Sequence, residues 1–371
     1  MLAGAGAAST GGLAAAFSHR TGPAGATADA GARLSGLSPR QLAGQRVIFS
    51  YAGLTPPASL LTQIKKGQAA GVIFYADNIS SKPQIKGVIR QLQQAAAQSR
   101  VPEPLLMMTD QEGGEVRRLP GAPALSEKQV GESSDPLAAA RRAGRGAGLN
   151  LKSAQMNVNL APVLDVYRTP GNFIDQYGRS YSSNPQTVAR LGTGFVRAQQ
   201  RTGVAAAAKH FPGLGAAATS QDTDSRPVTL RVPKRQLRTV DELPYGSAIP
   251  AGVKLVMVSW AVYPALDPTR PAGLSSSVVR GELRSRLGFR GVTVTDALEA
   301  GALHAYGSTA NRAVLAAGAG MDLLLCAGQN VGQGTAAVTA LSSALKSGEL
   351  RRPPFIHSAN RVLGLRSKLG S

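Results

Sequence analysis

From Gln45 onward, short apolar runs alternate along the chain with longer segments in which polar and apolar residues mix at helical spacing. The eight apolar runs are QRVIFSY (45–51), AGVIFY (70–75), LLMMTD (105–110), MNVNLAPVLDV (156–166), VAAAAKHF (204–211), KLVMVSW (254–260), GVTVTDAL (291–298) and MDLLLCA (321–327). This alternation is typical of repeated strand and helix units. It predicts an α/β fold in which eight parallel strands close into a single TIM-like (β/α)8 barrel.

The segments between the runs carry helix signals. One is SKPQIKGVIRQLQQAAAQS (81–99), and another, DPLAAARRAGRGAGLNLK (135–152), opens with an N-cap aspartate followed by a proline at the first helical position. An open doubly wound sheet is the alternative topology. The glycine-rich phosphate loop that would support it does not follow the first apolar run.

The first 33 residues have a different composition, rich in Ala, Gly, Ser and Thr. They contain too little apolar surface to offset the entropy of ordering, so we expect residues 1–33 to form a disordered tail, or the remnant of a signal or linker, ahead of a barrel domain over 34–371. The start of this segment resembles the apolar part of a secretion signal but lacks preceding positive charges. A secreted or cell-envelope location is therefore expected, and a cytoplasmic one stays open.

Polar residues stand at or just beyond the ends of several predicted strands. They are Asp110, Asp165, Lys209, His210 and Asp296. The carboxyl ends of barrel strands meet at one rim, where the reactive residues of such folds collect. Arg117 and Arg118 follow Asp110, and Arg179 lies in the loop after the fourth run. Carboxylates and guanidinium groups gathered at one rim suit the hydroxyl groups of a sugar.

Charge and composition narrow the partners. Lys and Arg (41) outnumber Asp and Glu (21), for a net charge of +20, which admits nucleic acid or an anionic cell wall. No nucleic-acid-binding motif accompanies the basic residues, so we expect association with an anionic cell wall and no nucleic-acid partner. No apolar run reaches the roughly 20 residues of a membrane span. A single cysteine and four scattered histidines provide no metal-ligand spacing, so we expect neither a metal nor a cofactor. The chain is expected to be a monomer.

Eight segments between about Gln45 and Leu325 occur in an order that resembles glycoside hydrolase family 3, especially its single-domain bacterial β-N-acetylhexosaminidases. They are GVIFYADNI, DQEGGEVRRLP, NLAPVLDV, GRSY, KHFPGLG, VMVSWAVYPALD, LSSSVVRGELRSRLGFRGVTVTDAL and AAGAGMDLLL. The resemblance implies a barrel catalytic domain and retaining exo-hydrolysis that releases terminal β-linked N-acetylglucosamine from peptidoglycan- or chitin-derived glycans. It also implies that Asp296 is the nucleophile. The implied substrate-binding residues are Asp110, Arg117 or Arg118, Arg179, Lys209 and His210, with Asp322 contributing less directly.

The acid/base of such a reaction is not matched by the resemblance. The best-known single-domain members carry an Asp-Ser-His triplet in the loop after KHFPG, whereas this chain has Asp224-Ser225-Arg226. Arginine cannot be deprotonated in a protein, so Arg226 cannot replace the histidine. Asp222 and Asp224 are the candidate acids, provided that burial raises their pKa toward the working pH. His304 lies on the same rim but on another loop.

Trp260, the only tryptophan, ends the sixth apolar run. A tryptophan there would either stack on a sugar face or plug the barrel mouth, and we interpret Trp260 as a substrate contact. Two alternative functions stay open. The chain could be a catalytically impaired sugar-binding or wall-binding protein, or an enzyme with β-glucosidase-type specificity.

Overall fold

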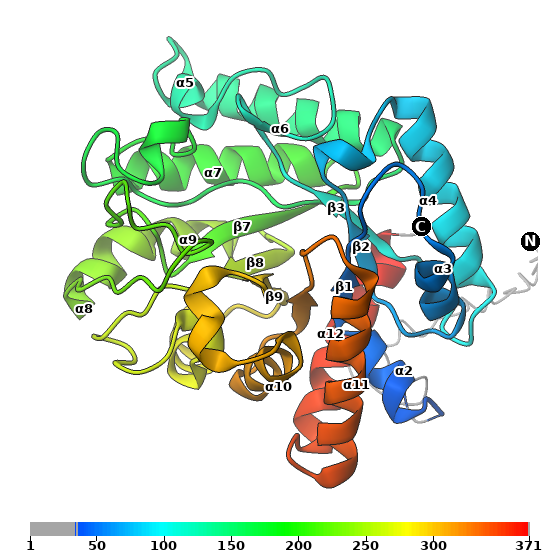
Figure 1. The fold of residues 1–371 in the computed structure, drawn as a ribbon. Helices are drawn as coiled ribbons and strands as arrows, with labels where there is room; N and C mark the ends of the chain where they lie inside the picture. The colour runs from blue at the N-terminus through cyan, green and yellow to red at the C-terminus, as the bar shows by residue number, and fades with distance from the viewer. Residues whose placement is uncertain (1–33, 35, 370–371) are drawn as a thin grey trace, which may run out of the picture.

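The computed structural model describes residue 34 and residues 36–369, so the tail expected over residues 1–33 lies outside the described residues. Eight parallel strands form a closed barrel in the order β1-β10-β9-β8-β7-β6-β3-β2 (Figure 1). They are β1 (Val47–Phe49), β2 (Gly71–Ile73), β3 (Leu106–Thr109), β6 (Val158–Asn159), β7 (Ala205–Phe211), β8 (Leu255–Val258), β9 (Val292–Ala297) and β10 (Leu323–Leu325). Each predicted apolar run contains one strand, which confirms the predicted (β/α)8 barrel.

The first and last strands close the sheet. Val47 of β1 is in register with Leu324 of β10, and Ile48 is in register with Gly71 of β2. Because β1 has a partner on both sides, the sheet has no free edge at this point. The open doubly wound alternative is therefore excluded.

Alternating side chains along the strands build two apolar layers. Ile48 of β1 packs inside the barrel, while its neighbours Val47 and Phe49 pack outward against the helices. β7 follows the same rule, with Ala205 and Ala207 in the inner cluster and the intervening alanines in the outer one. This period of two explains why the strands read as continuous apolar runs, since both faces are buried.

Helices surround the barrel (Figure 1). They are α2 (Pro39–Gly44), α3 (Ala58–Lys65), α4 (Lys82–Ala97), α5 (Glu127–Gly131), α6 (Pro136–Ser153), α7 (Pro185–Gln200), α8 (Lys234–Gln236), α9 (Leu243–Ala248), α10 (Thr309–Ala319), α11 (Val331–Ser347) and α12 (Arg352–Leu369). The cap predicted for α6 is present, because the side chain of Asp135 accepts a 3.1 Å hydrogen bond from the amide of Ala138. No helix in residues 36–369 combines the length and the apolar character that crossing a lipid bilayer requires.

Short elements complete the loops. A two-stranded hairpin, β4 (Gln111–Gly113) and β5 (Val116–Arg117), follows β3. The 3-10 turns are η1 (Ala76–Asn78), η2 (Asp175–Tyr177), η4 (Ala272–Leu274) and η6 (Gly301–Tyr306), and the π-helical turns are η3 (Leu237–Asp241) and η5 (Ser277–Arg286). The hairpin and η6 follow β3 and β9 directly, so both stand at the carboxyl rim of the barrel.

The amino end of the barrel is closed by buried ion pairs, and Asp322 belongs to them. Asp322 precedes β10, is fully buried, and accepts a 2.7 Å hydrogen bond from Arg361 of α12 as well as one from Arg284. Both arginines outweigh the effect of burial and lower the pKa of its carboxyl group. The prediction that Asp322 supports the substrate pocket is wrong, because a residue before a strand lies at the opposite end from the rim.

Candidate active site

A cavity of about 420 Å³ opens at the carboxyl end of the barrel strands. Its size falls in the range of about 300–1,000 Å³ typical of small-molecule sites. Seven residues predicted from the sequence line it: Asp110, Arg118, Arg179, Lys209, His210, Asp224 and Asp296. Apolar side chains of the barrel interior, including Leu160 and Met257, form part of its lining. The structure therefore brings most of the predicted rim residues into one pocket.

Lys209 is the buried centre of an ion-pair network. Its Nζ lies 2.6 Å from Oδ1 of Asp110 and 2.7 Å from Oε1 of Glu112. Burial disfavours the charged amine, but the two carboxylates outweigh it and raise the pKa of Lys209. A lysine on an alanine-rich strand thus stays charged, and it holds Asp110 at the pocket wall.

Glu112 was not predicted from the sequence, although it organises two of the predicted residues. Arg179 binds its carboxylate through two hydrogen bonds of 2.9 Å each, from Nε and from Nη2. Burial opposes ionisation of Glu112, but Arg179 and Lys209 prevail and lower its pKa to about 2. The sequence signal that could have identified Glu112 is its position two residues after Asp110, because alternate residues of an extended segment share a face.

His210 is oriented by a buried carboxylate. Its Nδ1 lies 2.7 Å from Oδ2 of Asp165, and its Nε2 lies 3.5 Å from Nη2 of Arg179. Arginine can only donate, so Nε2 accepts and we assign the proton to Nδ1, which donates to Asp165. Asp165 is held in turn by the amide of Leu214 at 2.7 Å.

Asp296 stands at the end of β9 and lines the pocket. Its Oδ1 accepts a 2.8 Å hydrogen bond from the amide of Ala297. The side chain is partly accessible, in contrast to the fully buried strand residues that precede it. The Asp296 carboxylate is therefore accessible from the cavity.

Asp224 reaches the same pocket from the loop after β7. The amides of Gly301 and Ala302 donate to the carbonyls of Asp224 and Thr223 at 2.7 and 3.0 Å, which ties this loop to the segment just after β9. Asp224 stays exposed at the pocket mouth, and the Asp296 charge, followed by partial desolvation and the Asp222 charge, raises its pKa to about 7. Near neutral pH, Asp224 can therefore hold a proton in the pocket that Asp296 also lines.

Asp222 and Arg226 flank Asp224 but do not line the pocket. Oδ1 of Asp222 accepts from the amide of Asp224 at 2.8 Å, and its carbonyl accepts from the amide of Arg226 at 3.1 Å. Asp222 therefore shapes the turn that presents Asp224, and of the two candidate acids only Asp224 lies in the site. Arg226 and His304 are exposed and also lie outside the pocket lining.

Trp260 is fully buried, so the prediction that it contacts substrate is wrong. One edge of its indole packs on Gly273, where a Cβ atom would come within 2.4 Å of the ring. Its Nε1 donates a 2.8 Å hydrogen bond to the carbonyl of Ala297, the residue after Asp296. Trp260 thus supports the strand end that carries Asp296.

Arg117 also lies outside the pocket. It is exposed, and its Nη1 donates to the carbonyl of Gly121 at 2.9 Å. Arg118 lines the pocket instead, and its backbone amide donates to the carbonyl of Asp110 at 3.2 Å. Of the two adjacent arginines, Arg118 is therefore the candidate for sugar binding.

Two further lining residues were not predicted. Glu299 follows Asp296 by three positions, and its Oε2 accepts from the amide of Ala327 at 3.2 Å and from Gln333 at 2.8 Å. Tyr75 ends the second apolar run, a rim position of the same kind as Asp110. Burial raises the pKa of both groups, so the Tyr75 hydroxyl stays protonated and can donate. Within residues 36–369, no group of three or more His, Cys, Asp and Glu side chains is arranged to hold a metal ion.

Comparison with known proteins places these observations in a family context. Residues 44–365 match the model of the glycosyl hydrolase family 3 N terminal domain. The chain is 47% identical over 330 residues to an uncharacterized secreted glycosyl hydrolase of Arthroderma benhamiae, covering 89% of this chain and 93% of the relative. It is 32% identical over 291 residues to a beta-hexosaminidase of Stenotrophomonas maltophilia, covering 75% and 82%.

A solved structure shows the same fold. The structure of a glycoside hydrolase family 3 beta-N-acetylglucosaminidase from Paenibacillus sp. superimposes with a TM-score of 0.85 at 35% identity. The match covers 90% of this chain and 63% of that chain, so this chain spans less than two thirds of the solved relative.

Proposed function

Because the chain belongs to glycosyl hydrolase family 3, we propose that it is a retaining exo-β-N-acetylhexosaminidase that releases terminal N-acetylglucosamine. The single observation that carries this proposal is the pairing of Asp296 with Asp224 in one pocket, where the Asp296 charge raises the pKa of Asp224. A carboxyl group with a raised pKa beside a second carboxylate is what an acid and a nucleophile at a glycosidic bond require.

In the proposed mechanism, the ionised carboxylate of Asp296 attacks the anomeric carbon while protonated Asp224 donates its proton to the glycosidic oxygen. The bond to the leaving sugar breaks, and a glycosyl ester forms on Asp296. Asp224 then removes a proton from water as that water attacks the anomeric carbon and releases Asp296. The two inversions leave the anomeric configuration unchanged.

The remaining pocket residues would hold the terminal sugar. Asp110 is partly accessible and can accept hydrogen bonds from sugar hydroxyl groups. Lys209 and Arg179 lie behind it and stay charged, because the carboxylate of Glu112 forms an ion pair with each of them. His210 also lines the pocket, and its Nε2 accepts from Arg179, which fixes the orientation of both side chains. A pocket whose polar wall is prearranged in this way suits one terminal pyranose, which supports exo action.

The test is steady-state hydrolysis of an aryl β-N-acetylglucosaminide and of N,N'-diacetylchitobiose by the wild type and by Asp296→Ala. We expect both activities of the variant to fall to background, with the fold retained by circular dichroism. Unchanged hydrolysis in Asp296→Ala would overturn the nucleophile assignment. A matched aryl β-glucoside tests the alternative specificity, which would be favoured if the glucoside were the better substrate.

The second candidate function is sugar binding without efficient turnover. Its support is the replacement of the family histidine by Arg226, which is exposed and lies outside the pocket lining. It predicts affinity for N-acetylglucosamine together with a failure to cleave the natural disaccharide. Cleavage of N,N'-diacetylchitobiose at a rate that depends on Asp224 would exclude it.

We further propose that the protein is secreted or associated with the cell envelope, acts there on wall-derived glycans, and works as a monomer. The Arthroderma benhamiae relative is named as a secreted hydrolase, and the charge of +20 favours an anionic surface. Fractionation of producing cells tests the location, and activity confined to the cytosol would contradict it. Light scattering of the purified chain measures its mass in solution, and a mass of two or more chains would contradict the monomeric state.

A further inference from the structure

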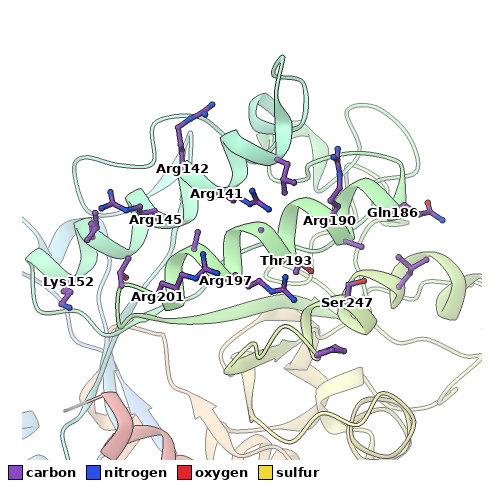
Figure 2. A pocket seen from close by; sticks show the side chains of 18 residues that line it. Arg141, Arg142, Arg145, Lys152, Gln186, Arg190, Thr193, Arg197, Arg201 and Ser247 are labelled. Carbon is purple, nitrogen blue, oxygen red and sulfur yellow. The ribbon is translucent and has the colours of Figure 1, made fainter.

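A larger cavity, of about 1,270 Å³, lies on the outer side of the barrel, away from the candidate active site. It is formed by α6 and α7, which run side by side, and by residues at both ends of α9 (Figures 1 and 2). From α6 it receives Arg141, Arg142, Arg145 and Lys152, and from α7 and its end it receives Arg190, Arg197 and Arg201. We call this cavity the arginine groove.

The cations stand in rows set by helical periodicity. Arg141 and Arg145 are one turn apart on α6, and Arg197 and Arg201 are one turn apart at the end of α7. The two helices approach closely, since a Cβ on Gly144 would come within 2.4 Å of the Phe195 carbonyl. Arg141 and Arg145 repel one another at this spacing and weaken α6, so their pairing is not explained by helix stability.

These seven side chains are exposed, and none forms an ion pair with an Asp or Glu of the described residues. The lining of the groove includes no acidic residue. By contrast, Arg179 in the active site is paired with Glu112. Six free guanidinium groups in one concave surface can each bind a carboxylate or a phosphate through two parallel hydrogen bonds.

We propose that the arginine groove binds an anionic glycan, a saccharide or polyol chain that carries carboxylate or phosphate groups. The rest of the lining favours such a ligand over nucleic acid. It contains no aromatic side chain on which a base could stack, which single-stranded nucleic-acid sites usually provide. It does contain Leu137, Leu149, Thr193 and Ser247, which suit the carbons and hydroxyls of a sugar or polyol backbone.

The proposal does not rest on the catalytic assignment, because the groove shares no residue with the active-site pocket. Binding there would tether the enzyme to a polymer and raise its local concentration near glycosidic bonds on the same material. Hydrolysis of a small soluble substrate would not depend on the groove.

The test measures binding of the full chain to polygalacturonate, which presents carboxylates, and to polyglycerol phosphate, which presents phosphates, over a range of salt concentrations. The groove variant combines Arg141→Gln, Arg190→Gln and Arg197→Gln. The control combines Arg231→Gln, Arg235→Gln and Arg290→Gln, which removes the same charge at exposed positions outside both cavities. Comparison of the two polymers identifies which anionic group is preferred.

We expect the groove variant to lose roughly tenfold in affinity for at least one polymer, and the control variant much less. Both should hydrolyse the aryl substrate at the wild-type rate, and Asp296→Ala should bind the polymers normally, which separates this proposal from the catalytic one. Equal losses of polymer affinity in both triple variants would show that binding depends only on the net charge of the protein, which would overturn the proposal. If the groove bound single-stranded or duplex DNA more tightly than either polymer, the ligand would be a nucleic acid and the glycan proposal would be overturned.

Discussion

The backbone amide of Gly301 donates a 2.7 Å hydrogen bond to the carbonyl of Asp224. This contact joins the loop after β7 to the segment after β9, and therefore sets the candidate acid beside the candidate nucleophile. Gly301 is required by packing, because a Cβ at this position would come within 2.2 Å of the Ser225 carbonyl. The chemistry of the site thus depends on a close contact between two backbones.

Gly301→Ala should displace the loop that carries Asp224. Proton donation would suffer, and we expect cleavage of N,N'-diacetylchitobiose to fall by roughly tenfold or more, up to the roughly 10⁴-fold loss that removal of a general acid can cause. An aryl substrate with a good leaving group should lose much less. Gly364→Ala in α12, where a Cβ meets nothing within 4 Å, is the matched control. Equal losses on both substrates would argue against a displaced acid.

The pH profile should report Asp224. Because its pKa is raised to about 7, the protonated acid is lost as the pH rises through that value, and kcat/KM for the disaccharide should fall on the alkaline side. Asp224→Asn should remove this limb together with most disaccharide activity. Asp222→Asn should keep the limb but shift it to lower pH, since the Asp222 charge contributes to the raised pKa. An alkaline limb that persists in Asp224→Asn would assign it to another group.

Trp260→Phe should impair catalysis without weakening sugar binding. The substitution leaves the Ala297 carbonyl without its donor, at a cost of about 1–3 kcal/mol in the free energy of unfolding. We expect a lower kcat, because the support of the Asp296 strand end is loosened, and an almost unchanged KM. Thermal unfolding and steady-state kinetics measure the two effects. A raised KM with an unchanged kcat would instead indicate contact between Trp260 and the sugar.

Glu112→Gln should destabilise the protein at neutral pH. The Glu112 pKa falls from its ordinary value of 4.5 to about 2 on folding, which corresponds to about 3 kcal/mol. This contribution is complete above pH 4.5 and disappears as the pH falls toward 2, so the difference between variant and wild type should narrow in acid. Denaturant unfolding at several pH values measures it. Exposed Glu115→Gln is the control, and a similar effect there would contradict the account.

The barrel could be predicted from the sequence because both faces of every strand are buried, which makes the strands visible as continuous apolar runs. The position of the pocket followed from the direction of the strands, because the carboxyl ends of parallel barrel strands meet at one rim. Asp110, Lys209 and Asp296 were correctly placed there as residues that line one pocket. The same rule applied to Asp322 would have placed it at the opposite end, since it precedes the apolar residues Leu323–Leu325.

The missed features depend on contacts between distant segments. Trp260 is buried because Gly273 leaves room for its ring, and Asp224 rather than Asp222 reaches the pocket because of Gly301. Glu112 becomes important only when Arg179 and Lys209 converge on it. The contacts of Trp260 and Asp224 have no local pattern, so neither composition nor spacing could predict them, whereas Glu112 could have been found from its spacing to Asp110.

The most direct test of the catalytic account is to trap the covalent intermediate. The enzyme is incubated with a fluorinated N-acetylglucosaminyl fluoride, which slows breakdown of the glycosyl ester, and the labelled peptide is identified by mass spectrometry. We predict one sugar per chain, attached to Asp296, and no label in Asp296→Ala. Label on another carboxylate, or turnover of the natural disaccharide without any trapped ester, would contradict the account.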